Sequence, residues 1–201
     1  HSGTLAGSNV ALAAQTLNNN AGLISQSAAD GSLTITTQGL LDNQNIKSND
    51  AATKPLGMLA NGIALINAGD VNNQSGRINA NTVTLTSTGS SVNNNQGEIA
   101  ANQALSLNAG NANVSNQTGQ LLGHTINMMA ASLDNSHQGL VLANQDLAVN
   151  TGTINNTNTK QASDATLSQG FVAGGNATLT AAVVNNTNGQ IVTGDSANLN
   201  V

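Results

Sequence analysis

The ionisable side chains of this 201-residue chain are few and scattered. Charged residues make up 6% of the sequence, against roughly 25% in ordinary globular domains. Asp70, Arg77 and Glu98 form the best candidate group for cleavage of a polysaccharide, a reaction that uses carboxylates about 5 to 10 Å apart. We interpret the acidic residues instead as solvated surface charges and predict that the chain is not an enzyme. The acidic residues are Asp30, Asp42, Asp50, Asp70, Glu98, Asp134, Asp146, Asp164 and Asp195.

The histidines and the lack of cysteine bear on metal binding. His124 and His137 could meet on one side of a repeat, but no third ligand stands in register with them. Cysteine is absent, which excludes thiolate ligands and disulfide bonds. We therefore expect no metal site, no catalytic residues and no cofactor. Six Asn-x-Ser/Thr sequons, which we attribute mostly to composition, begin at Asn73, Asn113, Asn116, Asn155, Asn176 and Asn185.

Composition also bears on partners. The formal charge of −5 is spread thinly, and the chain has neither a basic patch nor a set of aromatic rings on which bases could stack, so nucleic-acid binding is disfavoured. No run approaches the ~18 consecutive apolar residues of a membrane-spanning helix. The opening residues, HSG, are not those of a signal peptide, and we interpret the chain as a segment of a longer protein.

Residues 81–101, NTVTLTSTGSSVNNNQGEIAA, form the repeating unit that positions these side chains. Val83 and Leu85 alternate with threonines, and Val92 and Ile99 lie in two more short alternating stretches. Turn-forming residues separate the three predicted strands. Because so small a unit cannot bury its apolar face alone, we expect it to stack on copies of itself.

The apolar-x-apolar pair of the first strand recurs nine times, with a period of about twenty-one residues and two longer steps. We expect each pair to point into a common core, with Met128 inward and Met129 outward or at a corner. The pairs are Val10/Leu12, Leu33/Ile35, Ile63/Leu65, Val83/Leu85, Leu105/Leu107, Ile126/Met128, Leu147/Val149, Ala177/Leu179 and Ala197/Leu199.

A column of asparagines repeats with the same period. Each follows an apolar residue and one small polar residue, and in most repeats a glycine stands three residues further on. Because Asn and Gly accept left-handed backbone angles, we interpret the column as a corner. Stacked amides can hydrogen-bond from one coil to the next, as in cross-β ladders. The predicted ladder consists of Asn19, Asn43, Asn73, Asn94, Asn116, Asn135, Asn156 and Asn186.

Two eleven-residue stretches interrupt the pattern, at residues 47–57 (KSNDAATKPLG) and 160–170 (KQASDATLSQG). They begin 113 residues apart, as do Leu41 and Ile154 in the repeat, so we infer a higher-order repeat of five coils. The two loops should then leave the same side of the rod, roughly 24 Å apart at ~4.8 Å per coil. Long loops on a rigid scaffold often carry function. The candidate contact residues are Lys47, Asp50, Lys54, Lys160 and Asp164.

These patterns predict an all-β fold, a right-handed parallel β-helix of about nine coils with three short strands per coil. Leucine-rich repeats would need a helical return segment, and calcium-binding rolls would need tandem Gly-Gly-x-Gly-x-Asp motifs. The right-handed sense follows from the strong preference for right-handed crossovers between parallel strands. Residues 1–201 would form one shaft segment, roughly 43 Å long by strand spacing.

The coils resemble the repeats of filamentous haemagglutinins, as in residues 175–192, GNATLTAAVVNNTNGQIV. Those repeats form the shafts of large exoproteins that Gram-negative bacteria secrete by two-partner systems, among them adhesins and contact-dependent growth-inhibition effectors. The resemblance covers nearly the whole chain except the two loops. The Asn-Pro-Asn-Gly-type motifs of the family's amino-terminal secretion domain are absent. The resemblance implies a secreted, cell-surface protein that is exported through an outer-membrane transporter.

Three functions remain open. The leading hypothesis is a structural rod that projects a distal adhesive or toxic domain for cell contact. The alternative is a binding module whose two loops contact a host receptor, a glycan, a target-cell surface or a neighbouring rod. The third is a polysaccharide lyase or hydrolase of the β-helix type.

Overall fold

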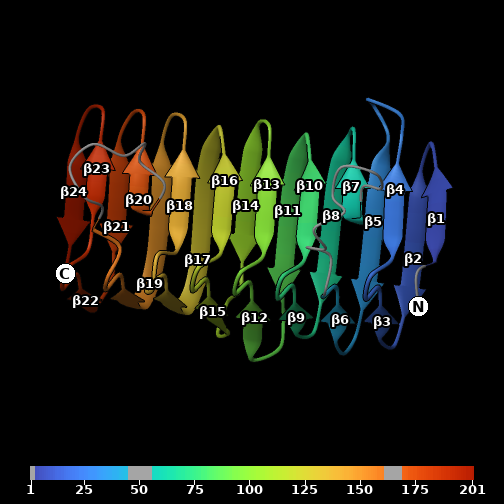
Figure 1. Ribbon diagram of the computed structural model, residues 1–201, viewed down its shortest axis with the longest axis horizontal. Coiled ribbons are helices and arrows are strands. Elements are labelled where there is room, and N and C mark those ends of the chain that lie inside the picture. The colour runs from blue at the N-terminus through green and yellow to red at the C-terminus, as the bar shows by residue number, and fades with distance from the viewer. Residues whose placement is uncertain (1–2, 45–55, 161–168) are drawn as a thin grey trace.

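The computed structural model describes residues 3–44, 56–160 and 169–201, and within these ranges the chain forms strands and no helix. All of its strand pairs are parallel, and the coils stack along the long axis of the molecule (Figure 1). The predicted all-β parallel solenoid is therefore confirmed. Lys47, Asp50, Lys54 and Asp164 lie outside the described residues, so their role as contact residues stays a prediction.

One strand from each coil joins a nine-stranded sheet. Its strands, in spatial order, are β1 (Thr4–Gly7), β4 (Leu23–Gln26), β7 (Gly57–Ala60), β10 (Arg77–Ala80), β13 (Glu98–Ala101), β16 (Gln120–Gly123), β18 (Leu140–Ala143), β20 (Gly170–Ala173) and β23 (Ile191–Thr193).

The other strands form a fifteen-stranded sheet with two arms, which we call the long-strand arm and the short-strand arm. The long-strand arm consists of β2 (Val10–Ala14), β5 (Ser32–Thr37), β8 (Ile63–Ala68), β11 (Thr82–Ser87), β14 (Ala104–Asn108), β17 (Thr125–Asp134), β19 (Leu147–Asn155), β21 (Ala177–Thr180) and β24 (Ala197–Asn200). The short-strand arm consists of β3 (Leu17–Asn18), β6 (Leu41–Asp42), β9 (Val71–Asn72), β12 (Ser91–Asn93), β15 (Asn113–Ser115), the second halves of β17 and β19, and β22 (Val183–Asn185). The described chain thus makes about eight full coils and part of a ninth.

The core is a stack of aliphatic side chains that each coil adds to in the same way. Val83 pairs with Leu105, and Leu105 pairs with Ile126, so equivalent residues lie directly above one another. These side chains are buried, and their outward-pointing neighbours along each strand are not. Met128 is fully buried and Met129 is 50% exposed, as the alternation predicts.

The prediction for β8 is wrong by one residue. Ile63 and Leu65 face solvent, with 43% and 37% of their side chains exposed, and Ala64 and Ile66 lie in the core instead. Register explains the difference, because Val83 of the next coil pairs with Ala64. Four consecutive apolar residues leave the inward face of this strand undetermined by its own sequence, so the neighbouring coils select it.

The two interruptions begin and end at equivalent places. One lies between β6 and β7 and the other between β19 and β20, so both join the short-strand arm to the nine-stranded sheet. Five steps of that sheet separate β7 from β20, which agrees with the higher-order repeat. The re-entry residues Gly57 and Gly170 both have positive φ, and a Cβ added to either would collide with a backbone oxygen of the next coil. Only glycine fits that combination.

Candidate functional site

The asparagine ladder runs through every complete coil. In each step the Nδ2 of one asparagine donates to the Oδ1 of the asparagine in the next coil, over 2.7 to 3.1 Å. The predicted ladder is confirmed at all eight positions. All these bonds point the same way, from the first coil towards the last.

In each interior ladder asparagine, both the side-chain oxygen and the side-chain nitrogen make hydrogen bonds. Asn94 accepts from Asn73, donates to Asn116, and gives its second amide hydrogen to the backbone oxygen of Gln120 at 3.1 Å. Asn94 is fully buried, so each of these bonds replaces one that water would have made. An amide offers both a donor and an acceptor, and neither a carboxylate nor an aliphatic side chain can do so.

The left-handed backbone angle at this corner does not fall on the residues that the sequence suggested. Neither the ladder asparagines nor the glycines that follow them have positive φ. The residue with positive φ is instead, in seven coils, the second residue after the ladder asparagine. Five of these seven residues are not asparagine, which explains why residue type did not reveal the position. They are Ala21, Ser75, Gln96, Thr118, His137, Asn158 and Asn188.

Thr118 should be the most strained of these residues, because a β-branched side chain fits the left-handed region poorly and its φ is 56°. We expect Thr118→Asn to raise the free energy of unfolding by about 1 kcal/mol, since Asn tolerates this region. Urea unfolding followed by circular dichroism measures the change. Thr84→Asn, in the extended strand β11, is the matched control and should not stabilise the fold. Equal shifts for both variants would contradict the strain argument.

The glycines of the corner are needed for space instead. A Cβ added to Gly97 would lie closer than 3.0 Å to the backbone oxygen of Asn73 and to the Oδ1 of Asn94. The equivalent positions Gly76, Gly119, Gly139 and Gly189 meet the same pair of atoms in their own coils. The glycine therefore lets the chain pass directly over the ladder.

Polar side chains just before the ladder form a second, partly exposed column. Asn93 donates to Asn72 at 3.2 Å, and Asn155 donates to Asp134 at 3.1 Å. Burial raises the pKa of Asp134, but hydrogen bonds from Ser136 and Gln117 outweigh it, so the net pKa lies below its ordinary value. This carboxylate is therefore an ionised part of the corner.

The candidate acidic group does not assemble. Arg77 and Glu98 pair across β10 and β13, with Nε and Oε1 3.3 Å apart. Asp70 lies at a different corner, where its carboxylate accepts the backbone N–H groups of Ser90 and Ser91, each at 2.8 Å. The structure therefore brings two members of the predicted group together and leaves the third outside.

Asp70 should make stability depend on pH. The hydrogen bond from the Ser90 N–H lowers the pKa of Asp70 below its ordinary value. Burial raises this pKa by less, and the hydrogen bonds from Ser91 lower it further. A lowered folded-state pKa stabilises the fold above the unfolded pKa of ~3.9, and this contribution disappears as pH falls through the folded-state pKa. We expect Asp70→Asn to lower the urea midpoint at pH 7, and to lower it by progressively less as pH falls below ~3.9. Asp30→Asn is the control, because Asp30 accepts no hydrogen bond from the described residues. A loss of stability by Asp70→Asn that is the same at pH 7 and at acidic pH would contradict a role for the hydrogen bonds to the Asp70 carboxylate.

The histidines and several sequons are placed apart from any site. His124 lies at the corner between β16 and β17, and His137 lies at the ladder corner, so they do not meet. Both are exposed. Within the described ranges no three metal-ligating side chains come together. The sequon asparagines Asn73 and Asn116 are fully buried ladder residues.

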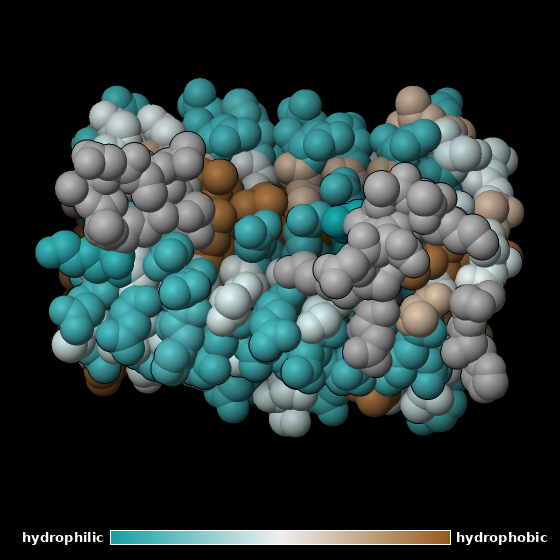
Figure 2. Space-filling view, in the orientation of Figure 1, coloured by the Kyte–Doolittle hydropathy of each residue, from teal (hydrophilic) through white to brown (hydrophobic). Residues whose placement is uncertain are grey.

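The outer face of the nine-stranded sheet carries an apolar row that the sequence did not predict. Ala100, Leu122 and Leu142 stack in register on this face and are half-buried. Figure 2 shows this face, with a hydrophobic band over β16 and β18 between hydrophilic edges. The row lines a shallow trough of about 430 Å³. Each of these leucines follows another apolar residue, so alternation along the strand could not show that they face outward.

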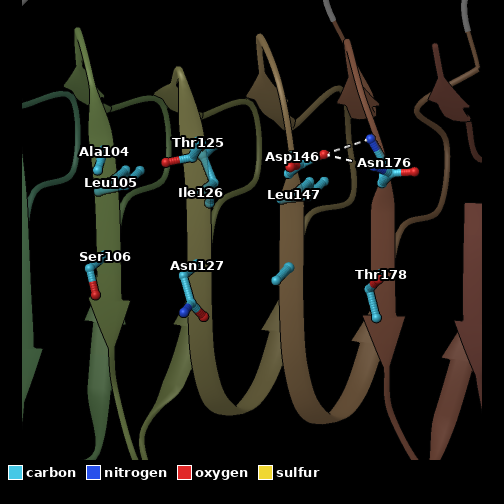
Figure 3. A pocket seen from close by; sticks show the side chains of 11 residues that line it. Ala104, Leu105, Ser106, Thr125, Ile126, Asn127, Asp146, Leu147, Asn176 and Thr178 are labelled. Atoms are coloured by element: carbon cyan, nitrogen blue, oxygen red, sulfur yellow. Dashed lines mark hydrogen bonds between the residues drawn. The ribbon is translucent and has the colours of Figure 1, made fainter. Parts of the chain in front are cut away.

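A second trough, of about 400 Å³, lies across β14, β17, β19 and β21 on the outer face of the long-strand arm (Figure 3). Its carboxylate, Asp146, accepts the backbone N–H of Asn176 at 2.9 Å and its Nδ2 at 3.1 Å. These two bonds lower the pKa of Asp146. The carboxylate thus fastens one coil to the next, and the remaining side chains drawn in Figure 3 are small, aliphatic or neutral.

Comparisons with known proteins returned no match to this chain from family models, from curated proteins or from solved structures. Among the described residues there is no helix long and apolar enough to cross a membrane.

Proposed function

We propose that this chain is a segment of a stiff rod in a large secreted surface protein of the filamentous haemagglutinin type. The rod would hold a distal adhesive or toxic domain away from the cell, after export through an outer-membrane transporter. The observation that carries this proposal is the unbroken series of amide–amide bonds through all complete coils. Backbone bonds that run between coils rather than within them resist bending along the axis. The resemblance of the coil sequences supports the surface location.

Two measurements test this proposal. Small-angle scattering of the purified chain should report an elongated particle with an axial length of roughly 43 Å. Antibodies raised against the chain should label intact cells of the organism that makes it, and protease treatment of those cells should remove the label. Labelling that requires permeabilised cells would exclude a surface rod.

A second candidate function is binding of a receptor, glycan or neighbouring rod through the two inserted segments. It is favoured by the equivalent flanks of both insertions, which leave one corner five coils apart. Residues 45–55 and 161–168 can be replaced by short turns while Gly57 and Gly170 are kept, since these glycines belong to strands. Unchanged cell adhesion by a correctly folded variant would eliminate this candidate. Polysaccharide cleavage is not proposed, because the predicted acidic group does not assemble among the described residues.

A further inference from the structure

Three asparagines of the described chain precede a small residue that favours spontaneous deamidation. In this reaction the backbone nitrogen of the next residue gives up its proton and attacks the Cγ of the asparagine. The new N–Cγ bond closes a succinimide ring while the side-chain nitrogen leaves with that proton as ammonia, and water then opens the ring to aspartate or isoaspartate. A following glycine has no Cβ to obstruct the attack. The sequence therefore ranks Asn61-Gly62 and Asn188-Gly189 equally, ahead of Asn135-Ser136.

The structure holds both partners of the Asn61-Gly62 pair. The N–H of Gly62 donates to the Oε1 of Gln26 at 3.0 Å, and the Nδ2 of Asn61 donates to the backbone oxygen of Ser27 at 2.8 Å. Gly62 is buried, and Gln26 is 2% exposed with its own amide nitrogen bonded to two backbone oxygens. The attacking nitrogen is therefore occupied, and the amide that it would attack is held in another direction.

The Asn135-Ser136 pair is held by the ladder. Asn135 is fully buried, and its side chain accepts from Asn116 and donates to Asn156. The N–H of Ser136 donates to the Oδ1 of Asp134 at 3.1 Å. Attack on this side chain would require the loss of the ladder bonds and of the Ser136 bond together.

The Asn188-Gly189 pair is held much less. Asn188 is exposed, and its side chain makes no hydrogen bond with any of the described residues. The N–H of Gly189 donates to the backbone oxygen of Asn186 at 2.9 Å, three residues earlier in the same turn. Because this bond closes a single turn, it can open without separating two coils. Such local openings need less free energy than the opening of bonded coils.

We propose that Asn188 is the first of these three asparagines to deamidate in the folded chain, and that the fold protects Asn61 and Asn135. The product carries a new negative charge at a ladder corner. Isoaspartate also lengthens the backbone by one methylene between Asn186 and Gly189, so the hydrogen bond that closes this turn is lost. The modification thus loosens the corner that holds Asn186 of the ladder. The inference is independent of the proposed function, because it follows from hydrogen bonds within the chain.

The test incubates the purified 201-residue chain at mildly alkaline pH, both folded and in urea. Proteolysis and mass spectrometry follow the conversion of each asparagine separately. In urea, Asn61 and Asn188 should react at similar rates, and Asn135 more slowly. In the folded chain, Asn188 should react roughly tenfold or more faster than Asn61, because its turn opens locally. Equal rates for these two asparagines in the folded chain, or a faster reaction at Asn61 or Asn135, would overturn the proposal.

Gln26→Ala tests the protection directly, since it removes the acceptor of the Gly62 N–H. The rate at Asn61 should rise by roughly tenfold, and the rate at Asn188 in the same sample is the internal control and should not change. An unchanged rate at Asn61 in the folded variant would contradict the protection. Because Gln26 is buried, melting curves show whether the variant folds. If it does not fold, the ratio of the two rates in the unsubstituted chain decides.

Discussion

Gly97→Ala is expected to lower the free energy of unfolding by about 3 kcal/mol or to prevent folding. The added Cβ would collide with the backbone oxygen of Asn73, which accepts the N–H of Gly76, and with the Oδ1 of Asn94, which accepts the Nδ2 of Asn73. The first atom cannot move away without breaking the corner bond, and the second cannot move without breaking the ladder, so the strain has no inexpensive release. Urea unfolding of the folded variant, or its recovery in the soluble fraction, measures the effect.

Gly110→Asn is the matched control for this prediction. Gly110 has a φ of 52°, and nothing lies within 4 Å of a Cβ built at this position. Asn tolerates the left-handed angle, so this variant should unfold close to the unsubstituted chain. If the two variants had the same unfolding midpoint, the close approach over the ladder would not be the reason for the glycine.

Asn94→Asp is expected to be the most damaging substitution of a single ladder side chain, at about 3 to 5 kcal/mol near neutral pH. A carboxylate there would lose both donors and would face the Oδ1 of Asn116 and the backbone oxygen of Gln120 without any hydrogen between them. Because burial favours the neutral acid, the variant should regain stability relative to the unsubstituted chain as pH falls. Thermal unfolding at pH 7 and pH 4 tests both statements.

Asn95→Asp serves as the comparison. We expect position 95 to accept a carboxylate because its hydrogen bonds are preserved, and not because the side chain faces solvent. Asn95 is half-buried, and its Oδ1 accepts the backbone N–H of Gln117 and the hydroxyl of Ser115, both at 2.8 Å. A carboxylate preserves both bonds, so little stability should be lost. Equal melting temperatures for Asn94→Asp and Asn95→Asp would mean that the ladder contributes little.

The repeat and the ladder could be predicted from the sequence because both depend on residue type at a fixed spacing. An amide is the side chain that bonds equally well to the coil above and the coil below, and Asn stands at all eight positions. Alternating aliphatic residues likewise mark a strand with one buried face.

Other features depend on neighbouring coils and could not be predicted in this way. The inward face of β8 follows from pairing with Val83, because Ile63 and Ala64 are both apolar. The left-handed residue of the corner varies from alanine to threonine, since the ladder on one side and the glycine on the other constrain the backbone there. The outward row through Leu122 could not be predicted for the same reason as the inward face of β8. The buried Leu121 and the outward-pointing Leu122 are both apolar, so their order does not show which of them faces the core.

The uniform direction of the ladder bonds has a consequence for how such a chain evolves. Every interior coil presents the same acceptor to the coil before it and the same donor to the coil after it. Duplication or loss of one coil's worth of gene sequence, cut at the ladder asparagine, therefore joins two surfaces that already match. The length of the rod can therefore change by one coil at a time through unequal recombination, and the contact between the newly joined coils needs no further substitutions.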